Sequence, residues 1–89
     1  MAQNFKIDLQ KQGSDILIKL KGDFDGSSAL ELCHVLEQHI EKNNQIIIHT
    51  SGLSEVYPFG LTIFSRRYSP KKRGSRLSFT GSHKTMLQV

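Results

Sequence analysis

Six basic residues lie close together in the second half of the chain: Arg66, Arg67, Lys71, Lys72, Arg73 and Arg76. A cluster of one sign attracts phosphate groups, anionic lipids or acidic proteins. The charge is unevenly divided, because residues 1–57 hold five basic and all eight acidic residues, whereas residues 58–89 hold seven basic and no acidic residues. The cluster therefore predicts an anion-binding surface, with an ordinary solvated face as the alternative.

Few residues have the types and spacing that catalysis requires. His34 and His39 are five residues apart on a predicted helix, about 140° around its axis, so they cannot share a ligand or a proton. Serine and aspartate side chains are present, but no nucleophile motif such as Gly-x-Ser-x-Gly supports them. The lone cysteine, Cys33, falls in an apolar pattern typical of a buried thiol. We therefore expect no catalytic residues, no cofactor and no metal site.

The length of the chain limits what it can form. With 89 residues, we expect residues 1–89 to make a single small domain. Apolar runs such as residues 46–48 are far shorter than the roughly 20 residues of a membrane span. The first residues contain no apolar segment of a secretory signal, and one cysteine allows no internal disulfide. These features favour a cytoplasmic protein.

The spacing of apolar residues predicts four strands. Alternating patterns cover residues 5–9 and 16–21, and the turn at residues 12–14 between them predicts a hairpin. Three successive isoleucines predict a third strand at residues 45–49, covered on both faces of the sheet. A fourth strand is expected at residues 76–80, and residues 50–57 are expected to form a loop.

Helical spacing predicts two amphipathic helices and a short third one. Ser28 and Glu31 have the spacing of a capping box, which places the first helix start at Ser28. The second helix begins at Pro58, where a missing N–H costs nothing, and ends at Pro70. A third helix at residues 83–89 is short or truncated. The apolar stripe of the first helix comprises Ala29, Leu32, Cys33, Leu36 and Ile40.

The resulting order is strand–strand–helix–strand–helix–strand, followed by the short helix. It predicts an α/β fold in which helices pack on a mixed four-stranded sheet. This order resembles the STAS domain of sulfate transporters and anti-sigma-factor antagonists. The matching segments are Leu-Lys-Gly-Asp-Phe-Asp at residues 20–25, Ile-Ile-Ile at 46–48, Leu-Ser-Glu-Val-Tyr-Pro-Phe-Gly-Leu at 53–61, and the glycine-led strand at 74–81.

The resemblance has consequences for one short stretch. In anti-sigma-factor antagonists the second helix opens with Asp-Ser-Ser-Gly, where a partner kinase phosphorylates a serine or threonine. The corresponding residues here are Tyr57, Pro58, Phe59 and Gly60, of which only the glycine matches. The resemblance therefore implies that the phosphoacceptor is absent, while Asp25 matches a common acidic position. Phe59 is expected either to anchor a partner or to pack in the core.

Together these observations predict a non-enzymatic interaction module whose partner is a protein, either a regulatory kinase of the anti-sigma type or a component of a membrane transport complex. The oligomeric state stays open. A subunit of a membrane transport complex is one alternative function, and a basic nucleic-acid-binding protein that uses residues 66–76 is another. The expected partner contacts are Asp25, Glu55, Tyr57, Pro58, Phe59 and Gly60.

Overall fold

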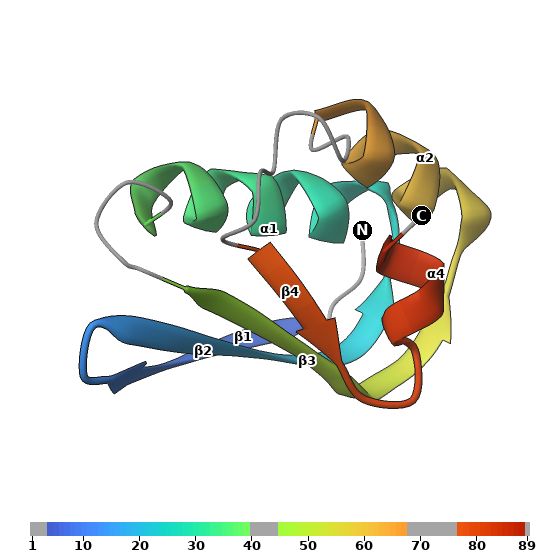
Figure 1. The fold of residues 1–89 in the computed structure, drawn as a ribbon. Coiled ribbons are helices and arrows are strands. Elements are labelled where there is room, and N and C mark those ends of the chain that lie inside the picture. The colour runs from blue at the N-terminus through green and yellow to red at the C-terminus, as the bar shows by residue number, and fades with distance from the viewer. Residues whose placement is uncertain (1–3, 40–44, 68–76, 89) are drawn as a thin grey trace.

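A four-stranded sheet carries helices on one of its faces in the computed structural model, which describes residues 4–39, 45–67 and 77–88 (Figure 1). The strand order across the sheet is β1-β2-β3-β4. The strands are β1 (Lys6–Gln12), β2 (Asp15–Phe24), β3 (Ile46–Val56) and β4 (Leu77–Thr80). The helices are α1 (Gly26–His39), α2 (Pro58–Arg67) and α4 (Lys84–Gln88).

The predicted hairpin and mixed sheet are confirmed. Strands β1 and β2 are antiparallel with Gln12 opposite Asp15, and Gly13 takes a φ of 64° in the turn, a left-handed conformation that suits glycine. Strands β2, β3 and β4 run parallel. The described parts of the chain thus have the predicted order of elements.

Among the described residues, helices cover one face of the sheet, which corrects the expectation for the third strand. Burial alternates along β3, so that Ile46 and Ile48 are buried and Ile47 is half-buried on the opposite face. Strand β2 alternates in the same way, with Ile16, Ile18 and Leu20 buried. The run of isoleucines resembled a strand covered on both faces, but the helices all lie on the same side (Figure 1).

The region at residues 50–57 is mostly strand rather than loop. Strand β3 continues to Val56, and β2 also extends beyond its predicted end to Phe24, with Phe24 opposite Val56. Two register shifts interrupt the pairing, between Lys19 and Lys21 and between Gly22 and Asp23. These irregularities break the alternation of apolar residues, which is why the sequence pattern did not indicate a strand.

The core is centred on aromatic rings and the apolar side of α1. Phe5, Phe24, Phe64 and Phe79 form a chain of edge contacts with centroid separations of 6.0, 6.4 and 6.0 Å. The predicted stripe on α1 is confirmed at all four described positions, while Ile40 lies outside the described residues. Burial raises the pKa of the Cys33 thiol to about 11, despite the opposing effect of Arg67.

Candidate protein-interaction surface

The first turns of α1 and α2 are in direct contact, although they are distant in the sequence. The Tyr57 N–H donates a hydrogen bond of 2.9 Å to the Phe24 carbonyl oxygen. At Gly60 the backbones come so close that an added Cβ would lie 2.7 Å from the Asp25 carbonyl oxygen. A glycine therefore permits this approach, and it places Asp25 beside the start of α2.

Asp25, rather than Ser28, caps α1. Its Oδ1 accepts a 2.9 Å hydrogen bond from the Ser28 N–H and a 3.0 Å bond from the Ser27 hydroxyl. Ser28 is buried inside the helix, and its hydroxyl lies 2.9 Å from both the Asp23 carbonyl oxygen and Asp25 Oδ1. The capping-box assignment was therefore wrong by three residues, because an aspartate upstream supplied the cap.

The capping bonds stabilise the charged form of Asp25. The Ser28 N–H makes the largest contribution, the Ser27 and Ser28 hydroxyls add to it, and together they lower the pKa of Asp25 from 3.8 to about 2. Asp25 is thus a fixed negative charge at neutral pH. Its carboxylate is engaged by its own helix, so its main role in the structure is to hold the start of α1.

Phe59 lies on the surface, with one side of its ring against α1. Its side chain is 69% exposed. A Cβ added to Gly26 would meet two ring carbons of Phe59 at 2.9 Å and the Ile63 Cδ1 at 3.1 Å, so the ring rests on the first residue of α1. Between the two expectations for Phe59, burial in the core is therefore wrong.

Two further exposed apolar side chains lie in the same region. Tyr57, which precedes α2, is 45% exposed, and Leu30, one helical turn after Gly26, is 47% exposed. The two helices stay adjacent further along, where Arg67 of α2 pairs with Glu37 of α1 at 3.6 Å. We call Leu30, Tyr57 and Phe59 the helix-start patch. Exposed apolar side chains gathered in one region mark interaction sites in many proteins.

Acidic residues lie at the strand ends that precede α1 and α2. Glu55 is exposed near the end of β3 and lies opposite Asp23 of β2 in the sheet. Asp25 lies between the end of β2 at Phe24 and the start of α1 at Gly26. Pro58 occupies the first position of α2, as predicted.

The basic cluster is only partly within the described residues. Arg66 and Arg67 are exposed in the last turn of α2, where positive charge is favourable to the helix dipole. The Arg67–Glu37 pair has both side chains about half exposed, so it contributes less than about 1 kcal/mol. Lys71, Lys72, Arg73 and Arg76 lie outside the described residues, and the six-residue surface stays a prediction.

A small polar cluster between the middle of β3 and the end of β4 was missed by sequence reasoning. The buried Thr50 hydroxyl donates to the Thr80 carbonyl oxygen at 2.8 Å and accepts from the His83 N–H at 3.1 Å. His83 Nδ1 lies 3.2 Å from the Thr50 carbonyl oxygen, so this nitrogen carries the proton. These bonds connect the middle of β3 to the end of β4 and to the turn that leads into α4, which gives the cluster a structural role.

Within the described ranges, no helix is long and apolar enough to span a membrane, and no three metal-binding side chains converge. The His34 ring nitrogen Nε2 lies 3.3 Å from the Gln38 side-chain nitrogen, one helical turn further along α1. The candidate surface is therefore the meeting point of the helix starts, where the structure brings together Asp25, Tyr57, Pro58, Phe59 and Gly60.

Comparison with known proteins identifies the fold. No protein-family model matches the chain, and no curated protein shows significant similarity to it. An anti-sigma factor antagonist from Mycobacterium paratuberculosis is similar over 91% of this chain and 71% of its own, with a TM-score of 0.69 and 15% identity. The antagonist SpoIIAA in its unphosphorylated form is similar over 94% of this chain and 78% of its own, with a TM-score of 0.64 and 17% identity.

A larger structure, that of Mglu, shares the same arrangement over 86% of this chain, with a TM-score of 0.71 and 10% identity. This chain spans only 20% of the length of Mglu. At identities this low the likeness concerns the fold and not the activity. The chain has the fold of the anti-sigma factor antagonists, which is the STAS fold that its sequence resembles.

Proposed function

We propose that this chain is a non-enzymatic protein-interaction module, and that the helix-start patch is its contact surface. The observation that carries the proposal is the 69% exposure of Phe59 at the start of α2. An aromatic ring left in water loses the free energy that burial would provide, about 25 cal/mol for each Å² of apolar surface. Aromatic side chains that a partner buries are frequent anchors of interfaces.

The chemistry of this surface differs from that of a phosphorylation switch. A phosphoserine at a helix start gains from the helix dipole and adds nearly two negative charges. Pro58 and Phe59 carry no hydroxyl, so the surface cannot be switched at these positions. We propose that binding here is constitutive and depends on apolar contact.

The acidic surroundings indicate what a partner needs. Glu55 and Asp23 lie beside each other at the ends of β3 and β2, next to the helix-start patch. A complementary partner offers an apolar pocket for Phe59 with basic side chains at its edge. The proposed partner class is a regulatory kinase of the anti-sigma type. A component of a membrane transport complex is the alternative within the same function.

The proposal is tested by affinity capture from native lysate, with and without nuclease, followed by mass spectrometry. Phe59→Asp is expected to reduce the amount of captured protein, because the loss of an anchor residue weakens binding by about 1 kcal/mol or more. Leu9→Asp is the matched control, since Leu9 is 42% exposed but lies on β1. Equal capture by Phe59→Asp and the wild type would refute the proposal. Loss of all partners after nuclease would instead assign the function to nucleic-acid binding by the basic cluster.

A further inference from the structure

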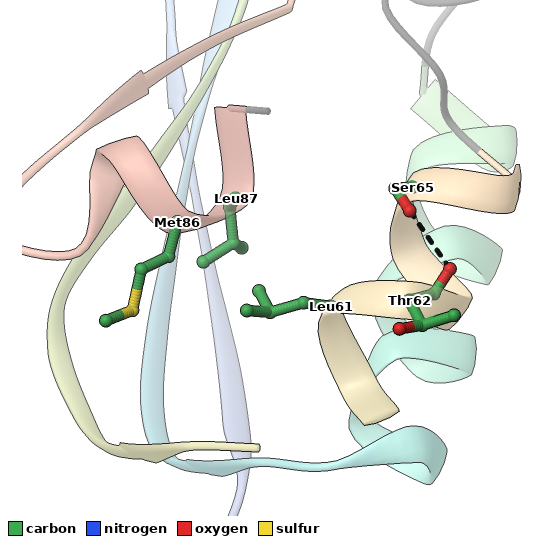
Figure 2. A pocket seen from close by; sticks show the side chains of 5 residues that line it. All are labelled: Leu61, Thr62, Ser65, Met86 and Leu87. Atoms are coloured by element: carbon green, nitrogen blue, oxygen red, sulfur yellow. Dashed lines mark hydrogen bonds between the residues drawn. The ribbon is translucent and has the colours of Figure 1, made fainter. Parts of the chain in front are cut away.

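A second apolar surface lies on the other flank of α2, between this helix and α4. The groove encloses about 330 Å³ and is lined by Leu61, Thr62, Ser65, Met86 and Leu87. Leu61 and Leu87 extend toward each other from the two helices (Figure 2). We call this the α2–α4 groove. It faces away from the contact between α2 and α1, because Phe59 and Ile63 occupy that flank.

The walls of the groove favour an apolar side chain over a small polar ligand. Small-molecule sites use a few converging polar groups to orient the ligand. Here the Thr62 hydroxyl donates to the Pro58 carbonyl oxygen at 3.0 Å, and the Ser65 hydroxyl donates to the Thr62 carbonyl oxygen at 3.1 Å. Both protons are therefore directed into α2 and not into the groove. Met86, 50% exposed, leaves further apolar surface at the rim.

An exposed positive charge lies beside the groove on α2. The groove is built from the part of the chain after residue 57, which contains no acidic residue. Arg66 is exposed one helical turn after Thr62, so the two side chains share a face of α2. A docking segment with carboxylates beside its apolar residues would complement this surface, whereas a basic segment would be repelled.

We propose that the α2–α4 groove binds an acidic amphipathic helix of a partner protein, with an apolar side chain seated against Leu61 and Met86 at the mouth of the groove. Amphipathic helices dock in apolar grooves through residues spaced three or four apart. The contact uses a different flank of α2 from the helix-start patch, so this proposal does not depend on the proposed function.

The test uses a synthetic amphipathic peptide of about 15 residues, long enough to be partly helical, with leucines on one face and glutamates on the other. The control peptide has lysine at every glutamate position. Methyl resonances of Leu61, Met86 and Leu87 are followed by NMR in the full chain during titration. We expect all three to shift with the glutamate peptide and none with the lysine peptide.

Variants separate this site from the helix-start patch. Arg66→Glu is expected to lower the affinity for the glutamate peptide by about fivefold at low salt, which is the upper range for one exposed charge pair. Ser65→Trp, which fills the groove, is expected to abolish the shifts, and Phe59→Asp is expected to leave them unchanged. The near-native spectrum of each variant verifies that it folds.

Three results would overturn the proposal. Equal binding of the glutamate and lysine peptides would show that charge plays no part. Binding of the glutamate peptide that survives Ser65→Trp would place the contact elsewhere. If sodium decanoate shifts the same methyl groups while the glutamate peptide does not, the groove takes an aliphatic anion rather than a protein helix.

Discussion

The close approach at Gly60 can be tested by adding one methyl group. In Gly60→Ala, the new Cβ would lie 2.7 Å from the Asp25 carbonyl oxygen and 2.9 Å from the Phe24 carbonyl oxygen. Both neighbours are backbone atoms, so neither can rotate away. To reach an ordinary contact of 3.4 Å, the start of α2 must move by about 0.7 Å relative to the turn before α1.

The magnitude follows from three terms. Overpacking costs about 1–3 kcal/mol. The same movement stretches the 2.9 Å hydrogen bond from Tyr57 to Phe24, which joins the two segments and contributes about 1 kcal/mol. Alanine is favoured over glycine within a helix by up to about 1 kcal/mol. The net effect is a destabilisation of about 1–3 kcal/mol, and its central value of about 2 kcal/mol lowers Tm by roughly 8–16 °C in a domain of this size.

Gly26→Ala provides the matched control for Gly60→Ala. Its Cβ would meet the ring of Phe59 at 2.9 Å, but that ring is exposed and can move. Gly26→Ala is therefore expected to change Tm little while it displaces Phe59 and weakens partner capture. Thermal unfolding followed by circular dichroism measures both variants. A Tm of Gly60→Ala equal to or above that of the wild type would refute the reasoning.

Three further predictions concern single side chains. The pKa of Asp25 is about 2 in the folded chain, against an ordinary value of 3.8. Its contribution to stability is therefore complete above about pH 4 and is lost as the pH falls through 2. Urea unfolding across this range should show a smaller decline in the free energy of unfolding for Asp25→Ala than for the wild type. Cys33, with a pKa of about 11, should react with iodoacetamide at pH 8 only after unfolding, and rapid labelling of the native chain would contradict its burial. Thr50→Val removes the bonds to Thr80 and His83 and should cost about 1–3 kcal/mol in urea unfolding; an unchanged midpoint would show that these bonds contribute nothing.

Sequence patterns predicted the fold well where burial alone dictates structure. The apolar stripe of α1 and the alternation in β2 follow directly from helical and strand periodicity, and the turn at Gly13 follows from glycine's access to positive φ. The same patterns failed where backbone hydrogen bonds determine the length of a strand and where a capping side chain determines the start of a helix. The second half of β3 is polar and is held as a strand by its pairing with β2, which no local pattern reports.

The residues of the candidate surface could be predicted from the sequence, but their exposure to solvent could not. The resemblance to STAS domains predicts that Tyr57, Pro58, Phe59 and Gly60 belong to the functional surface. Whether Phe59 points outward depends on the approach of α2 to Gly26, which is a tertiary contact between segments more than thirty residues apart. The α2–α4 groove was not predicted either, because its shape depends on how two helices pack that are separated by β4 in the sequence.

The most direct measurement of the central proposal is photo-crosslinking in native cells with benzoylphenylalanine at position 59. The same probe at Leu9, an exposed apolar position on β1, is the control. We predict that position 59 yields a specific protein adduct that resists nuclease, and that position 9 does not. Equal adducts at the two positions, or none at position 59, would contradict the assignment of the helix-start patch as the partner-binding surface.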